Sequence, residues 1–110
     1  MAYDEDLADR VREHLVGTRV TEKKMFGGLA FLVDGNMAVA ARGHGGLLVR
    51  VDPSESDRLV EEPGVEPMQM GGRAPMTGWL HVAAEAIADD ESLDRWVQRG
   101  VRYALSLPTR

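Results

Sequence analysis

The sequence predicts an α+β domain in which a mostly antiparallel sheet, with a β-meander as its core, is packed by amphipathic helices from the two ends of the chain. Segments near both termini repeat apolar residues at intervals of three and four, the period of a helix with one buried face. Between them, short apolar runs follow one another through tight turns, and strands connected in this way pair antiparallel. With 110 residues there is room for one domain, which we assign to residues 1–110 with its core at residues 5–107.

Residues 4–16 are expected to form the first helix. Its apolar side chains recur every four residues and make one stripe: Leu7, Val11 and Leu15. Asp4 or Asp6 can cap the first turn, and Gly17 supplies the left-handed residue at which many helices end. We therefore expect this helix to lie on the sheet with its charged face toward solvent.

The clearest local pattern predicts a β-hairpin. A strand at residues 19–26 precedes it, and apolar runs at residues 29–33 and 37–41 are joined by the turn Asp34-Gly35-Asn36. Both faces of the hairpin are apolar, because successive side chains of a strand point to opposite sides. The second face therefore needs a cover, either from the flanking amphipathic helices of the same domain or from a second copy in a homodimer.

The middle of the chain continues with short elements. A glycine-rich loop at residues 42–46 leads into a strand at residues 47–51. Pro53, with Asp52 as its cap, then opens a short helix that ends before Pro63. This places a helix between two strands.

The last third of the chain completes the sheet and adds the closing helix. Residues 65–70 contain a proline, which favours an edge strand, and residues 79–82 form the last strand. Asp89 or Asp90 caps a long amphipathic helix that ends near Pro108. Its acidic first turn and its later arginines suit the helix macrodipole, so we interpret these charges as helix stabilisers rather than as a binding surface.

The composition excludes several classes of protein. The chain has no cysteine, which excludes disulfides and thiolate chemistry, and its net charge of −5 disfavours direct binding to nucleic acid. Its histidines lack the spacing of a metal site, no glycine pair precedes Lys-Ser or Lys-Thr, and no nucleophile motif is present. We therefore predict no catalytic residues, no cofactor and no metal. The acidic amino terminus and the lack of a long apolar run predict a cytoplasmic protein that does not enter membranes.

One cluster is a candidate ligand site. Lys24, Arg50 and Arg73 lie on or beside strands, and Trp79 is close to Arg73 in the sequence. A guanidinium removed from water needs a partner, because its burial without one costs several kcal/mol. That partner is either an acidic side chain within the protein or a bound anion, and the sequence leaves both open.

Several motifs in order resemble the TfoX/Sxy amino-terminal domain family over residues 5–107. The first motif is Met25-Phe26-Gly27-Gly28. Later blocks include an arginine strand, a methionine before a glycine pair with an arginine, a Gly-Trp pair and an Asp-x-Trp in the closing helix: Arg50, Met70, Arg73, Gly78, Trp79, Asp94 and Trp96. The resemblance is to a single-domain member, without the carboxy-terminal domain that follows in the longer regulators.

The resemblance implies a small α+β domain linked to regulation of competence and transcription. We expect a non-enzymatic regulatory or binding module that acts through protein–protein interaction. The alternatives are a small-anion or small-molecule binding protein that uses the Lys/Arg/Trp cluster, and weak direct nucleic-acid binding through the basic residues 19–50, whose net charge is +3. Fold similarity alone does not decide between these functions.

Overall fold

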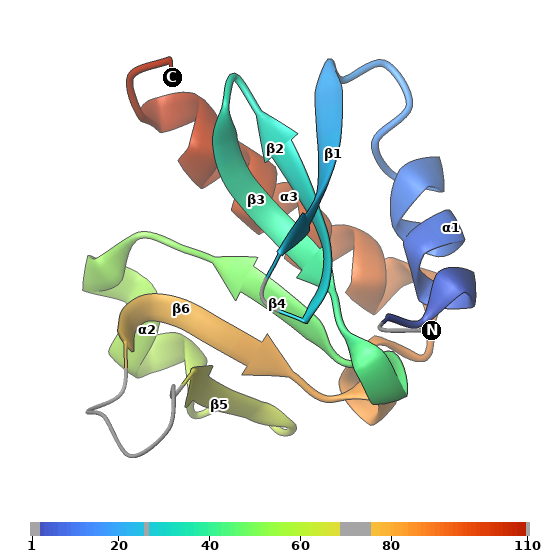
Figure 1. The fold of residues 1–110 in the computed structure, drawn as a ribbon. Helices are drawn as coiled ribbons and strands as arrows, with labels where there is room; N and C mark the ends of the chain where they lie inside the picture. The colour runs from blue at the N-terminus through green and yellow to red at the C-terminus, as the bar shows by residue number, and fades with distance from the viewer. Residues whose placement is uncertain (1–2, 26, 69–75, 110) are drawn as a thin grey trace.

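The computed structural model describes residues 3–25, 27–68 and 76–109, and its architecture confirms the predicted α+β class (Figure 1). Its helices are α1 (Glu5–Glu13), α2 (Pro53–Leu59) and α3 (Asp90–Ser106), with the 3₁₀ turns η1 (Gly43–Gly45) and η2 (Ala84–Ile87). Its strands are β1 (Val20–Met25), β2 (Gly28–Val33), β3 (Asn36–Ala41), β4 (Leu47–Arg50), β5 (Val65–Met68) and β6 (Met76–Val82). In the described part of the chain, no helix has the length and apolar character needed to cross a bilayer.

The strands form one six-stranded antiparallel sheet in the order β1-β2-β3-β4-β6-β5. The first four strands follow chain order, which confirms the meander, and β5 lies at an edge as its proline predicted. The predicted last strand was too short, because β6 begins at Met76 rather than Trp79. Gly78, which weakens the strand pattern in the sequence, is accommodated within β6 at a φ of 87°.

The predicted hairpin is confirmed with one correction at its turn. Asp34 and Gly35 alone join β2 to β3, and their φ values of 52° and 80° are those of a left-handed two-residue turn. Asn36 is not a turn residue: it pairs with Val33 as the first residue of β3. Its buried amide Nδ2 donates to the carbonyl oxygen of Pro108 at 2.9 Å, an acceptor that no local sequence pattern reveals.

Helix α1 is shorter than the predicted residues 4–16. It ends at Glu13, a turn follows, and Gly17 then adopts a φ of 89°. Asp4 caps the first turn as expected, since its carboxylate accepts a hydrogen bond from the backbone N–H of Leu7 at 3.0 Å.

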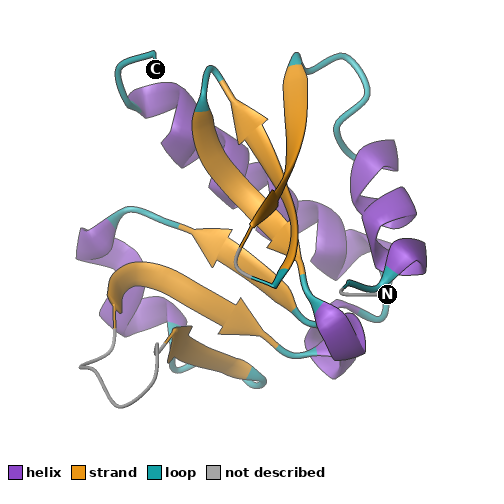
Figure 2. Cartoon of the chain, viewed as in Figure 1, coloured by secondary structure: helices purple, strands orange, loops and turns teal. Residues whose placement is uncertain are grey.

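The main core lies between the sheet and the helices. Figure 2 shows α3 passing behind the sheet and α1 at the side of the sheet. All three helices supply buried side chains to this core, among them Leu7, Val11, Leu59, Leu93, Trp96 and Val101. From the strands come alternate residues, including Phe31, Val39, Val49 and Leu80. The apolar stripe predicted for the first helix, Leu7, Val11 and Leu15, thus packs into the core as expected.

The other face of the sheet holds a smaller buried cluster made only of strand residues. Its members in the described ranges are Ala30, Met37, Ala40, Leu48 and Met68, with Met25, Leu32 and Trp79 packed against it. The expectation that the amphipathic helices shield both faces is therefore wrong. In Figure 1 the β2-β3 and β4-β6 pairs point in clearly different directions. This twist turns strands from the two halves of the sheet toward one another, so side chains of the sheet cover much of this face.

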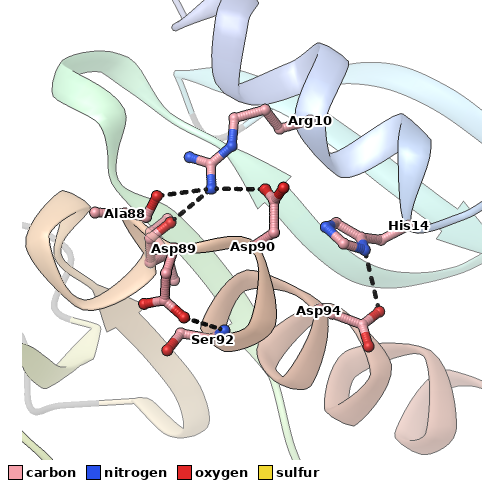
Figure 3. Close-up of polar contacts among 8 residues, drawn as sticks. Arg10, His14, Ala88, Asp89, Asp90, Ser92 and Asp94 are labelled. Carbon is pink, nitrogen blue, oxygen red and sulfur yellow. Dashed lines mark hydrogen bonds and ion pairs between the residues drawn. The ribbon is translucent and has the colours of Figure 1, made fainter.

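Polar contacts join α1 to the start of α3 (Figure 3). The guanidinium of Arg10 donates to the carbonyl oxygens of Ile87 and Ala88 at 3.0 and 3.2 Å and pairs with Asp90 at 3.3 Å. Along the same interface, His14 Nδ1 lies 3.2 Å from Asp94. These contacts position the amino-terminal turns of α3 against α1, and the rest of α3 extends beyond them.

Candidate functional site: an arginine-lined pocket

A pocket of about 540 Å³ lies between α2 and α3. Four arginines line it together with the following residues, and we call this site the arginine pocket: Val51, Asp52, Glu55, Arg58, Arg95, Arg99, Arg102, Tyr103 and Ser106. Its volume is in the range of small-molecule sites, roughly 300–1,000 Å³. The site therefore has room for one ionic group and its immediate surroundings.

The helix period brings three of the arginines together. Arg95, Arg99 and Arg102 stand at i, i+4 and i+7 in α3, which places them on one face of the helix. Arg58 comes from the last turn of α2 and shares the pocket with them. Four cationic side chains from two helices thus converge on one volume.

Arg99 is the most constrained of the four arginines. Its guanidinium carbon lies 4.4 Å from the ring centroid of Trp96, and Nη2 lies 3.6 Å from a carboxylate oxygen of Glu62. Its side chain is 23% exposed, and Nη1 is buried with no hydrogen-bond partner in the described residues. A guanidinium carries five N–H donors, so Arg99 has unused donor capacity in a fixed position.

The other arginines are only partly neutralised. Arg58 pairs with Glu55 at 2.8 Å on the exposed side of α2, and Arg95 donates to the hydroxyl of Ser92 at 3.3 Å. Arg102 is exposed and makes no ion pair within the described residues. Among the described residues, two acids line the pocket, Asp52 and Glu55, so this lining is net positive on a protein whose net charge is −5.

Asp52 is committed to the structure of α2. Its carboxylate accepts hydrogen bonds from the backbone N–H and the hydroxyl of Ser54 at 2.9 and 2.8 Å. These hydrogen bonds lower the pKa of Asp52, so the carboxylate is ionised near neutral pH. The arginines line the pocket beside a fixed negative charge that does not pair with them.

The sequence-predicted ligand site is assembled only in part. Arg50 and Trp79 are direct partners across β4 and β6, and the guanidinium of Arg50 lies 5.0 Å from the centroid of the Trp79 ring. It also lies 5.5 Å from the centroid of Tyr103, a residue that lines the arginine pocket. Arg50 therefore adjoins the pocket, and its cation is held between two aromatic rings.

Lys24 does not join this pair. It lies on β1, which β2 and β3 separate from β4, and it is the partner of Leu29. Directly opposed residues of an antiparallel pair share a face, and Leu29 belongs to the helix-facing core, whereas Trp79 packs on the other face. Arg73, the remaining member of the predicted site, lies outside the described residues.

The residues of the predicted family motif that the structure describes lie at close backbone contacts and in the smaller buried cluster. Gly27, at a φ of 69°, precedes β2, and Gly28 is the first residue of β2, where a Cβ would overlap the carbonyl oxygen of Ala41. Met25 and Trp79 pack against the smaller cluster, and Gly78 donates its backbone N–H to Ser56 Oγ at 3.2 Å, which ties β6 to α2. Phe26 lies outside the described residues.

Sequence reasoning missed the arginines of the arginine pocket. The arginines of α3 were interpreted as helix stabilisers from their position along the helix, without regard to the face on which they lie. The spacing of Arg95, Arg99 and Arg102 was the signal that could have found them, because it predicts a basic face. The sequence gives no sign that Arg58 belongs to the same site, because only the packing of α2 near α3 brings Arg58 to the pocket.

Comparison with known families agrees with the motifs. A family model described as the TfoX N-terminal domain matches residues 13–104 of the chain. The match runs from the end of α1 through most of α3 and includes the four arginines of the pocket. No curated protein matches the sequence significantly.

Proposed function

We propose, because the chain belongs to the TfoX N-terminal domain family, that it is a non-enzymatic regulatory module that acts in the cytoplasm by binding a protein partner. The regulated processes would be those linked to this family, competence and transcription. We place the partner contact at the arginine pocket, where an acidic segment of the partner docks.

The observation that carries this proposal is the convergence of four arginines on a protein that is acidic as a whole. Opposite charges across an interface steer the encounter and fix the register of the two partners. An acidic segment is attracted to the pocket and repelled by most of the remaining surface. The site therefore selects both the kind of partner and the orientation in which it binds.

The residue types of the pocket suit a protein interface. Arginine forms bidentate hydrogen bonds with carboxylates, and tyrosine contributes contact area together with a polar hydroxyl group. Tyr103 is half-buried between the pocket and Arg50, so it is held in place before a partner arrives. The entropic cost of ordering the interface is correspondingly small.

Binding of a defined acidic probe tests the proposal. A glutamate-rich peptide and a lysine-rich peptide of equal length are titrated at about 20 mM salt, where charge interactions are weakly screened. We expect the glutamate-rich peptide alone to bind. Arg95→Glu combined with Arg102→Glu should weaken it by at least about tenfold, because both side chains are exposed and their reversal replaces attraction with repulsion.

The matched control reverses an exposed cation elsewhere. Arg19→Glu changes the net charge of the molecule but lies before β1, outside the arginine pocket. If Arg19→Glu weakens binding as much as Arg95→Glu alone does, the peptide responds to net charge and the assigned contact is wrong. Photo-crosslinking from position 106 in the native cytosol would then identify the partner of the wild-type protein, since Ser106 lines the pocket and is exposed.

A second candidate function is binding of a free small anion, which the pocket volume of about 540 Å³ favours. Thermal shifts with millimolar phosphate, sulfate and small carboxylates separate the two functions. A ligand that binds only the native state raises the melting temperature. A shift with a free anion and no binding of acidic peptides would favour this second function.

A further inference from the structure

We propose that the ionic group recognised by the arginine pocket is a phosphate monoester, with Arg99 as its anchor and Arg58, Arg95 and Arg102 around it. This inference rests on the proposed function and specifies the chemistry of the same site. The phosphate is carried either by a side chain of a partner protein or by a small molecule, and the test below separates these two sources.

The first reason is the state of Arg99. Stacking on Trp96 and the approach to Glu62 hold the guanidinium in one place at the wall of the pocket. Because Arg99 is ordered in advance, little rotamer freedom is lost when an acceptor binds.

The second reason is the number of donors around one volume. A carboxylate has two oxygens and a charge of −1, whereas a phosphate monoester offers three terminal oxygens and a charge between about −1.5 and −2. Four guanidiniums line the pocket, and among the described residues Arg58 and Arg99 have an acidic neighbour within ion-pair distance, whereas Arg95 and Arg102 do not. The lining supplies more charge and more donors than one carboxylate uses.

The third reason concerns the surroundings of the pocket, which restrict the ligand to an isolated phosphate. Glu62 pairs with Arg99 beside the pocket, and further acids lie at Glu61, just after α2, and at Asp90 and Glu91 in the first turn of α3. A duplex or a long single strand would bring further phosphates close to these carboxylates and to a protein of net charge −5. One phosphate group held among arginines avoids that repulsion.

The test compares three peptides of the same sequence that carry phosphoserine, glutamate or serine at one central position. Titration by calorimetry at about 20 mM salt should show the phosphoserine peptide binding at least about tenfold more tightly than the glutamate peptide, and the serine peptide more weakly than both. Free O-phosphoserine forms the fourth arm. Weaker binding of the free amino acid than of the phosphopeptide identifies a protein as the source of the phosphate.

Variants assign the effect to the pocket. Arg99→Lys keeps the charge but removes the paired N–H donors of the guanidinium. It should lower the affinity for the phosphoserine peptide about tenfold and the affinity for the glutamate peptide much less. The double variant Arg95→Ala with Arg102→Ala should lower the affinity for the phosphopeptide by a similar factor. Both positions are exposed, so the fold should stay intact. Arg19→Ala is the matched control and should leave the affinity within about twofold.

The outcomes separate this inference from the proposed function. Equal affinity for the phosphoserine and glutamate peptides overturns the phosphate assignment and leaves docking of an acidic segment standing. Lack of binding by all three peptides overturns both. Binding of O-phosphoserine that matches the phosphopeptide supports the phosphate site and contradicts the assignment to a protein partner.

Discussion

Gly100 of α3 packs against Ala38 of β3 so closely that a Cβ at position 100 would overlap the carbonyl oxygen of Ala38. The same atom would lie 2.9 Å from Cγ1 of Val39, a buried core side chain. The distance between α3 and the sheet therefore depends on the absence of a side chain at this position. Gly100 follows Arg99 directly, so this contact also sets where the basic face of α3 stands.

Gly100→Ala should destabilise the protein by about 1–3 kcal/mol, because overpacking against backbone outweighs the helix propensity of roughly 1 kcal/mol that alanine adds. Urea denaturation measures the free energy of unfolding. Leu105→Ala, at an exposed position of the same helix, is the control and should change it by less than about 0.5 kcal/mol. A Gly100→Ala protein as stable as the wild type would contradict the close contact.

Glu22 should contribute acid-sensitive stability. Arg12 donates to both its carboxylate oxygens at 2.7 and 2.8 Å, and this pairing lowers the pKa of Glu22 in the folded state. A lowered folded pKa means that the contribution is complete above the unfolded value of about 4.3 and is lost as the pH falls through the folded value. Glu22→Gln should thus cost at most about 1 kcal/mol at pH 7, since the pair is exposed, and nothing at strongly acidic pH.

The control for this pair is Glu13→Gln, which removes an exposed acid from helix α1. Unfolding free energies of the three proteins are compared across pH 2–7. If the difference in unfolding free energy between wild type and Glu22→Gln does not become smaller at low pH, the lost stability comes from packing rather than from charge.

His81 should titrate below the ordinary imidazole value of about 6.5. Burial lowers its pKa first, and the positive charge of Arg42 adds to the effect, while Glu66 opposes it. The neutral form is favoured in the folded state, so stability is complete above the unfolded pKa and falls as the pH drops through the folded pKa. An NMR titration of the His81 ring checks this directly, and a midpoint at or above 6.5 would contradict it.

The chain should be a monomer in solution. The sequence left two covers open for the second face of the hairpin, the helices of the same domain or a second copy in a homodimer. In the structure this face is closed largely by strand side chains, with Ala30, Ala40 and Leu48 fully buried. Light scattering at about 100 μM gives the molecular mass, and a weakly associating dimer would be populated at that protein concentration. A dimer mass, abolished by Leu32→Lys on this face, would show that the cover is incomplete.

The elements themselves were largely predictable, since each rests on local chemistry. Asp52 before Pro53 and Asp89 before α3 act as the caps that their residue types indicate, and the two apolar runs around Asp34 and Gly35 form the hairpin. The errors lie where distant residues intervene. Asn36 pairs with Val33 as the first residue of β3, and its buried side-chain amide is satisfied by Pro108, 72 positions away in the sequence.

The candidate site was predictable only in pieces. Arg50 and Trp79 were placed together correctly, because both belong to strands that pair, whereas Lys24 was added to them without knowledge of strand order or face. The spacing of the arginines in α3 predicts that they share one face of the helix, but the sequence does not show that this face lies opposite α2.

By itself the sequence determined the fold class, the family and the period of each helix and strand, since these depend on neighbours a few residues apart. Only the tertiary structure decided that Arg58 lines the same pocket as Arg99 and that strands close the second face of the sheet. The physical reason is that charge and apolar surface act through space. Which cations share a pocket depends on the docking of α2 and α3, and docking depends on contacts such as Gly100 on Ala38 that bring distant segments together.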